Sequence, residues 1–212
     1  FFSDNGGMSA ANYFKPDRKI AAKNLDKAFS TSNLPLRGGK GWLYEGGIRE
    51  PLIISWKGTK LKKGSVSDIP VISTDFYPTL IELAGITSPS QMHLDGVSIA
   101  PVLENSGKTK ELKSRALYWH FPQYSNHGQQ SPGGAIRLGD YKLLEYYENC
   151  RVQLFDLRKD PGELHDLSEE MPQKTEQLKK MLDDRRIGIN ANMPCANPGY
   201  DPSYGNEWRN YE

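Results

Sequence analysis

The sequence has few cysteines and no long apolar stretch, and its charges nearly cancel. Only Cys150 and Cys195 occur among 212 residues, which excludes a disulfide-rich scaffold, although these two could pair or stay free. No apolar run is long enough to span a membrane. The 27 Lys and Arg residues face 26 Asp and Glu residues, so bulk charge gives no attraction to nucleic acid or to an anionic membrane. Any chemistry must therefore be sought in local motifs.

Glycines and charges gather instead in one segment, Asn33–Pro51, which reads NLPLRGGKGWLYEGGIREP. Glycine allows tight turns, and here it alternates with Arg37, Lys40 and Glu45. The pattern indicates a closely turning loop that presents several charges, as a binding loop does. The run that follows, Leu52–Trp56, is apolar and β-branched and predicts a buried strand.

The first residues of the chain supply a second motif. Phe1–Ser3 are typical of the last residues of a strand, and Asp4 and Asn5 follow at its carboxyl end, where open α/β sheets bind ligands. An adjacent carboxylate and carboxamide offer two of the oxygen ligands that calcium or magnesium prefers. A lysine on a glycine-rich loop, such as Lys40, can hold an anion. Each motif by itself could also be a plain turn or a solvated charge.

Taken together and in this order, the motifs resemble the second half of a type I sulfatase of the arylsulfatase family, within the alkaline-phosphatase-like superfamily. The matching stretches are Ser3–Gly7, Leu34–Gly41 and Tyr44–Pro51. The resemblance implies that Asp4 and Asn5 ligate a calcium ion and that Lys40 contacts the sulfate as a catalytic residue. It also implies an α/β fold, the C-terminal part of an alkaline-phosphatase-like sandwich followed by a small subdomain.

Residues 1–105 are expected to be the C-terminal part of the catalytic domain, with its N-terminal part missing. Within them, Met8–Thr31 is polar and lysine-rich and predicts a surface insertion near the site. Asp68–Gly85 predicts a helix with Ser73 or Thr74 as N-cap. Its apolar stripe would consist of Phe76, Leu80, Leu83 and Ala84.

Beyond the polar stretch Asn105–Lys113 the apolar period changes to two, which predicts a separate small α+β subdomain over residues 106–190. We expect a four-stranded antiparallel sheet covered by one helix, Gln173–Arg186, with an irregular tail at residues 191–212. The expected strands are Arg115–Phe121, Gly134–Leu138, Tyr141–Tyr147 and Val152–Leu157, with a hairpin turn at Gly139-Asp140.

The segment from Tyr118 to Gly134 combines aromatic and polar side chains, which suits a sugar with its apolar ring faces and rim of hydroxyls. His120 is the predicted substrate contact, with a structural histidine as an equal alternative; His127 is the weaker candidate.

The sequence that such sulfatases convert to the formylglycine nucleophile, C/S-x-P/A-x-R, is absent from these 212 residues. The resemblance implies that formylglycine lies in the missing N-terminal part, so this segment alone is expected to be inactive. The expected function is that of a calcium-dependent sulfatase, periplasmic or secreted, acting on a sulfated small molecule or glycan. The alternatives are a phosphatase, phosphodiesterase or phosphonate hydrolase of the same superfamily, or a stand-alone carbohydrate-binding module.

Overall fold

The computed structural model describes residues 1–7, 33–57, 61, 63–86, 93–104, 109–125, 130–201 and 203. The predicted insertion Met8–Thr31, the boundary at 105/106, His127 and residues 204–212 of the tail lie outside these ranges. The chain forms two compact units, Phe1–Leu52 with Tyr118–Glu212, and Ile53–Leu117. The domain limits expected from the sequence stay a prediction. No helix among the described residues is long and apolar enough to cross a membrane.

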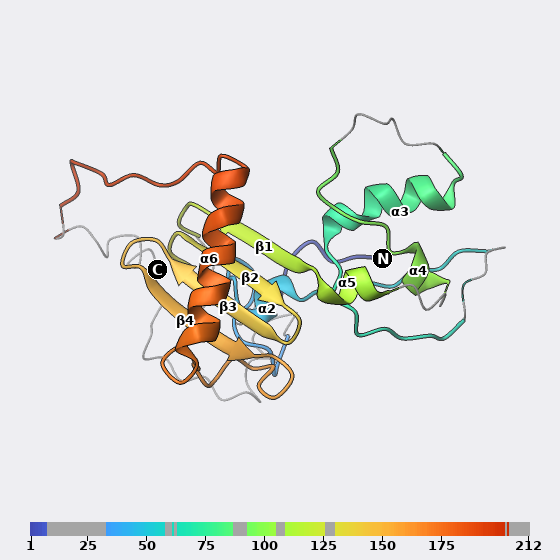
Figure 1. Cartoon of the computed structure of the whole chain (residues 1–212), viewed down its shortest axis with the longest axis horizontal. Helices are drawn as coiled ribbons and strands as arrows, with labels where there is room; N and C mark the ends of the chain where they lie inside the picture. The colour runs from blue at the N-terminus through green and yellow to red at the C-terminus, as the bar shows by residue number, and fades with distance from the viewer. Residues whose placement is uncertain are drawn as a thin grey trace. The chain divides into compact units, whose positions relative to one another are not determined.

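The first unit is built on a four-stranded sheet in the order β1-β2-β3-β4 (Figure 1). The strands are β1 (Ala116–Phe121), β2 (Gly133–Leu138), β3 (Tyr141–Tyr146) and β4 (Arg151–Asp156). β2 and β3 pair antiparallel with Leu138 opposite Tyr141, and β3 and β4 pair antiparallel in turn. Gly139 takes the positive φ of 60° that the tight turn between β2 and β3 requires. The four predicted strands and this turn are confirmed.

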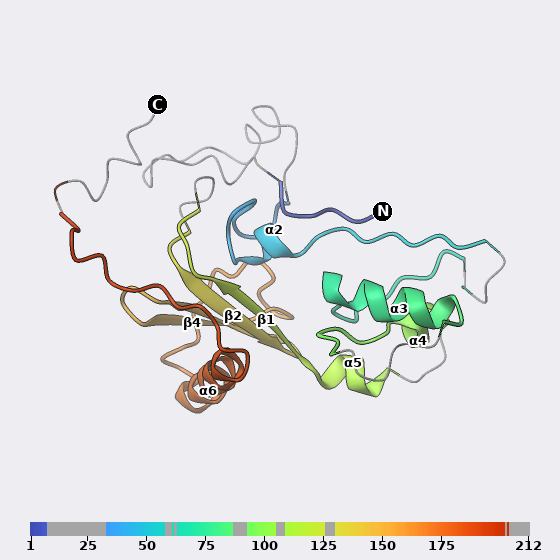
Figure 2. The same ribbon diagram turned by 90° about the horizontal axis from the view of Figure 1, so that it is seen from above.

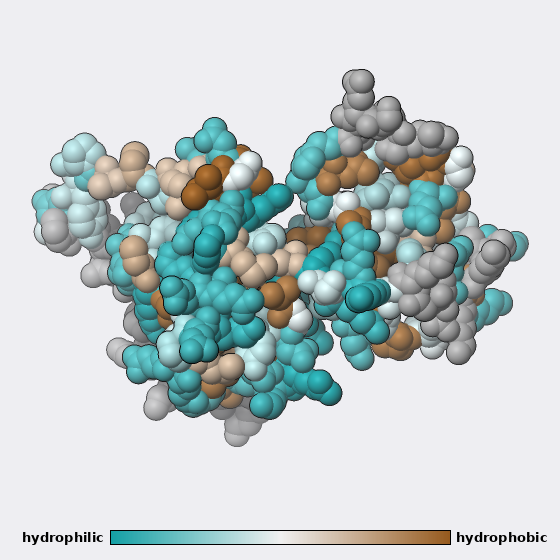
Figure 3. Space-filling model, viewed as in Figure 1, coloured by the Kyte–Doolittle hydropathy of each residue, from teal (hydrophilic) through white to brown (hydrophobic). Residues whose placement is uncertain are grey.

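One helix, α6 (Pro172–Gly188), covers one face of this sheet and contacts β2, β3 and β4. Pro172 lies in its first turn, where the missing N–H costs nothing. Leu178 and Leu182 of α6 are fully buried, while the outward face of α6 is largely hydrophilic (Figure 3). Figure 2 shows α6 on one side of the sheet and the short helix α2 (Glu45–Ile48) on the other. The predicted sheet with one covering helix is confirmed.

Alternation along β3 gives the sheet two different faces. Leu144 belongs to a hydrophobic cluster on the α2 side, together with Leu43, Tyr44, Ala135, Phe155 and Leu157. Its neighbours Leu143 and Glu145 point to the other face, where Glu145 pairs with Lys179 and Arg186 of α6. The segment Asn33–Pro51 therefore packs on the face that α6 leaves open.

The predicted strand Leu52–Trp56 is wrong. Leu52 forms only an isolated antiparallel bridge with Phe2, and the residues after it have no strand structure. Ile53 is 63% exposed, so the run is not buried. A β-branched run becomes a strand only where neighbouring strands supply hydrogen bonds along it, and among the described residues Phe2 alone forms a bridge with this run.

The second unit consists of short helices around a buried carboxylate. Its helices are η1 (Ser73–Asp75), α3 (Phe76–Leu83), α4 (Ala100–Leu103) and α5 (Lys110–Ser114). Asp75 is fully buried and accepts hydrogen bonds from the N–H groups of Ile72 (2.9 Å) and Val97 (3.1 Å). Arg115 completes the arrangement with an ion pair to Asp75.

The helix predicted in this unit is found as η1 and α3, but its predicted cap is wrong and its predicted stripe is only partly buried, at Phe76 and Leu83. Neither Ser73 nor Thr74 caps it; the carboxylate of Asp75 accepts the free N–H of Ile72 instead. Leu80 is 56% exposed, whereas Thr79 is buried and its hydroxyl donates to the carbonyl of Asp75. The polar contacts of Asp75 and Thr79 are thus buried on the inner side of the helix, as buried polar groups require.

Candidate functional site

The glycine-rich segment folds as a compact loop that closes on its own backbone. The N–H of Gly46 donates to the carbonyl of Arg37 (2.7 Å), and the N–H of Trp42 donates to that of Gly39 (3.0 Å). Gly46 packs so closely that an added Cβ would lie 2.5 Å from the carbonyl oxygen of Arg37. Only glycine fits this position, because the obstacle is backbone and cannot rotate away. The loop therefore holds Lys40 on a defined backbone path.

The first seven residues lie along this loop and are bound to it by backbone hydrogen bonds. The N–H of Gly6 donates to the carbonyl of Gly47 (3.2 Å), and the N–H of Lys40 donates to the carbonyl of Gly7 (3.0 Å). The N–H of Ser3 donates to the carbonyl of Pro51 (3.3 Å). These bonds bracket the segment that carries Asp4 and Asn5. The structure thus brings the three residues predicted for the metal and anion site onto two adjoining backbone segments, although they are far apart in the sequence.

Asp4 is exposed, and Asn5 and Lys40 are half-buried, so all three remain accessible to a ligand. Burial raises the pKa of Glu50, a hydrogen bond from Asn33 lowers it, and the negative charge of Asp4 raises it further. Asp4 and Glu50 therefore lie close enough for their charges to interact, and neighbouring carboxylates are groups that suit a hard cation. Among the described residues, no group of three or more His, Cys, Asp or Glu side chains is arranged to hold a metal ion. Asp4 and Asn5 fit calcium in ligand chemistry, but as two ligands of a larger set.

His120 lies elsewhere, because Trp119 and Phe121 pack against the cluster on the α2 side and strand alternation turns His120 to the face that α6 covers. Its Nε2 donates to the carbonyl of Asn192 (3.0 Å), so in the neutral ring Nδ1 accepts from the hydroxyl of Tyr147 (2.7 Å). The structure does not place His120 beside Lys40. Its role as a substrate contact stays a prediction.

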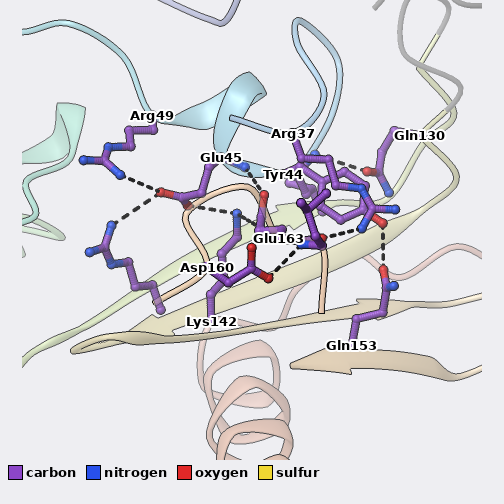
Figure 4. Close-up of polar contacts among 12 residues, drawn as sticks. Arg37, Tyr44, Glu45, Arg49, Gln130, Lys142, Gln153, Asp160 and Glu163 are labelled. Carbon is purple, nitrogen blue, oxygen red and sulfur yellow. Dashed lines mark hydrogen bonds and ion pairs between the residues drawn. The ribbon is translucent and has the colours of Figure 1, made fainter. Parts of the chain in front are cut away.

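The loop is fastened to the sheet by a buried group of charges that the sequence analysis missed (Figure 4). Nζ of Lys142, on β3, lies 3.0 Å from Oε1 of Glu45 and 2.9 Å from Oε1 of Glu163. All three side chains are at most 2% exposed. Arg137 of β2 lies 3.6 Å from the second oxygen of Glu45. Together Lys142, Glu45 and Glu163 are called the buried triad below.

Glu163 also binds the backbone of the loop. Its Oε2 accepts a hydrogen bond of 2.6 Å from the N–H of Glu45, and its carbonyl accepts one of 2.8 Å from Arg37. Burial raises the pKa of Glu163, while the charge of Lys142 and the N–H of Glu45 lower it. Burial lowers the pKa of Arg137, and the charge of Glu45 raises it. Each charge is thus removed from water but faces an opposite charge, which is the arrangement that makes such burial tolerable.

Aromatic side chains complete the attachment of the loop. The guanidinium of Arg37 lies 4.0 Å from the ring centre of Tyr44, and the hydroxyl of Tyr44 donates to Gln153 of β4 (2.7 Å). The N–H of Leu43 donates to the fully buried Gln130 (3.1 Å).

A pocket of about 530 Å³ lies elsewhere, around the C-terminal end of α6, and none of the predicted site residues lines it. The loop and the segment Phe1–Gly7 therefore form the candidate site.

Comparison with known proteins adds an independent finding. The family model described as N-sulphoglucosamine sulphohydrolase, C-terminal, matches residues 39–188, which include Lys40 and the whole sheet with α6. A sulfatase from Formosa agariphila is 37% identical over 180 residues, covering 81% of this chain and 29% of the relative. An N-acetylglucosamine-6-O-sulfatase from Bacteroides thetaiotaomicron is 32% identical over 165 residues, covering 74% of this chain and 29% of the relative.

A solved structure of a protein in complex with its substrate, D-glucosamine-2-N,6-O-disulfate, matches with a TM-score of 0.61 and 31% identity. The match covers 72% of this chain and 31% of that one. The chain thus spans about 30% of the length of each of these three relatives.

Proposed function

We propose that this chain, which belongs to the sulfatase family with the N-sulphoglucosamine sulphohydrolase C-terminal domain, forms part of a calcium-dependent enzyme that hydrolyses sulfate esters of carbohydrates. One observation carries the proposal: backbone hydrogen bonds hold Asp4 and Asn5 against the loop of Lys40. A metal ion and a lysine side by side can bind an oxyanion such as the sulfate group of a sulfate ester, because both are positively charged.

Each residue has a definite chemical task in this proposal. The carboxylate of Asp4 and the carboxamide oxygen of Asn5 would hold calcium, which when bound would polarise an oxygen of the sulfate group. The ammonium group of Lys40 would donate hydrogen bonds to the sulfate and stabilise negative charge on the departing oxygen. The backbone hydrogen bonds from Gly6 and Lys40 keep the segment of Asp4 and Asn5 next to the loop of Lys40. The three side chains therefore remain available for the metal and the sulfate.

The nucleophile is proposed to come from outside these residues. The 212 residues contain no C/S-x-P/A-x-R sequence from which formylglycine could be made. We infer that the N-terminal part of the same enzyme supplies it, and that this chain alone does not release sulfate.

A sulfated glycan is the proposed substrate class, since one relative is an N-acetylglucosamine-6-O-sulfatase and one solved relative holds a disulfated glucosamine. Such polymers lie outside the cell, so the proposed location is the periplasm or the extracellular space.

The test is an assay of the full-length protein on paired substrates. Sulfate release is measured from 6-O-sulfated N-acetylglucosamine, with the matching phosphate and phosphonate monoesters as competitors. We expect release of sulfate that stops on removal of calcium by a chelator and returns when calcium is added. Faster cleavage of the phosphorus esters would favour the phosphatase or phosphonate hydrolase alternative, and saccharide binding without any cleavage would favour a carbohydrate-binding module.

A further inference from the structure

The buried triad connects three parts of the chain that are remote in sequence. Lys142 belongs to β3, Glu45 opens α2 within the glycine-rich loop, and Glu163 ends the turn that begins at Asp160. In Figure 4 the side chain of Lys142 points up from the sheet toward Glu45 and Glu163, away from α6. The triad is thus the polar centre of the contact between the loop and the sheet.

We propose that Lys142 is a positioning residue for Lys40: by clamping Glu45 and Glu163 it fixes the glycine-rich loop on the sheet and so sets where the ammonium of Lys40 meets its anion. The proposal rests on the proposed function for the identity of that anion. It does not make Lys142 a catalytic residue, because its side chain is 0% exposed and lies between two carboxylates.

Stability alone is a weak reason for such a triad. Removing charges from water is costly, and an apolar replacement of similar volume is often neutral or stabilising. What the charges provide is direction, because Glu163 binds both Lys142 and the N–H of Glu45. An apolar contact has no preferred direction and would allow α2 to shift along β3. The directional contacts of the buried triad instead hold α2 in one position on β3.

The displacement of α2 would reach Lys40 through the backbone. Gly46, next to Glu45, is bonded to Arg37, and Gly47 is bonded to Gly6. The N–H of Lys40 is bonded in turn to Gly7. Any shift of Glu45 on the sheet therefore moves both the loop of Lys40 and the segment of Asp4 and Asn5.

The experiment is a double-mutant cycle in the full-length protein, combining Lys142→Met with Lys40→Ala. If Lys142 acts through Lys40, Lys142→Met lowers kcat/KM about 10- to 100-fold in the wild-type background, since a misplacement of about 1 Å can cost that much. In the Lys40→Ala background the loss should be much smaller, because only the displacement of the segment of Asp4 and Asn5 then contributes to it. Equal losses in both backgrounds, after correction for the folded fraction, would overturn the positioning role.

Leu143→Ala is the matched control. Leu143 is the next residue on β3, is also 0% exposed, and faces α6 rather than the loop. Its truncation leaves a cavity in the core and lowers the stability, but we expect the folded protein to keep its kcat/KM. A loss of activity as large as that of Lys142→Met would show that general loosening of the sheet, not the triad, is responsible.

A second variant covers the case in which Lys142→Met does not fold. Glu163→Gln keeps the shape of the side chain and an oxygen for the N–H of Glu45, but removes the charge that faces Lys142. We expect a smaller loss of kcat/KM than for Lys142→Met, and again a much smaller one in the Lys40→Ala background. Lys142→Arg, which retains the charge, should recover part of the activity, and an Arg variant as impaired as Met would contradict the proposal.

Hydrogen exchange gives a readout that does not depend on the reaction. The amide of Lys40, bonded to Gly7, and that of Gly46, bonded to Arg37, should exchange faster in Lys142→Met and unchanged in Leu143→Ala. Faster exchange in an enzyme that releases no sulfate would support the positioning role while refuting the proposed function. Unchanged exchange at both amides would refute the positioning role, whatever the substrate.

Discussion

Substitution of Gly6 by alanine tests how closely the segment of Asp4 and Asn5 must approach the loop of Lys40. A Cβ on Gly6 would lie 1.9 Å from the carbonyl oxygen of Gly46 and 2.9 Å from Cα of Gly47. Non-bonded atoms settle at about 3.5 Å, so the two segments must separate by more than about 1 Å. Both obstacles are backbone, and no side-chain rotation relieves the overlap.

The expected cost follows from two terms. Overpacking costs about 1–3 kcal/mol, and the hydrogen bond from Gly6 to Gly47, 3.2 Å long in the native chain, contributes about 1 kcal/mol more when it breaks. We expect a loss of about 2–4 kcal/mol in local stability. Because the displaced segment carries Asp4 and Asn5, kcat/KM for the sulfate ester should fall by about 100-fold, and the apparent calcium affinity should fall with it.

The assay compares Gly6→Ala with Gly188→Ala in the full-length protein, by thermal unfolding, calcium titration and sulfate release. Gly188 ends α6 and has no atom within 4 Å of the position of a Cβ. Alanine there should be neutral or stabilising by up to about 1 kcal/mol, with activity unchanged. Wild-type calcium affinity and kcat/KM in Gly6→Ala would refute the reasoning that the close backbone approach builds the site.

Two further predictions concern charges away from the site. Arg115→Met leaves the fully buried carboxylate of Asp75 without its partner and should destabilise the second unit by about 3–5 kcal/mol, measurable as early loss of amide protection in α3; protection equal to wild type would contradict this. The second prediction concerns the pKa of Asp166. Burial raises this pKa, but hydrogen bonds from the N–H groups of Leu154 and Ser168 lower it by more, so that it lies below its ordinary value. The unfolded chain therefore binds more protons than the folded one, so the stability from Asp166 is present above its ordinary pKa and is lost as pH falls through the lowered value. The free energy of unfolding, measured with urea at several acidic pH values, should fall less steeply with falling pH in Asp166→Asn than in the wild type. An equally steep fall in both proteins would contradict this prediction.

The sheet and α6 were predictable because their signals are local. The short apolar and aromatic run of β3, the Gly139-Asp140 turn and Pro172 at the start of α6 each specify their element within a few residues. The prediction of a strand at Leu52–Trp56 was wrong for the opposite reason. The strand propensity of a run can be read from its own residues, but whether it pairs depends on residues elsewhere in the chain.

The site was predictable only in part. Asp4, Asn5 and Lys40 were found as motifs, and the structure joins their segments through backbone bonds. The buried triad was missed because its members are remote in sequence. Glu45 lies 97 positions from Lys142 and 118 positions from Glu163. A lysine at a buried position of a strand, with leucines following it, is the one signal that could have pointed to it.

The most direct test of the central claim is the rate of sulfate release by the full-length protein with Lys40 and with Lys40→Ala, at saturating calcium. If Lys40 stabilises the charge of the departing oxygen, the substitution should lower kcat by about 10²- to 10³-fold without unfolding the loop, whose bond to Gly7 is made by the backbone. Equal kcat values for the two proteins, or no sulfate release by the wild type, would contradict the account.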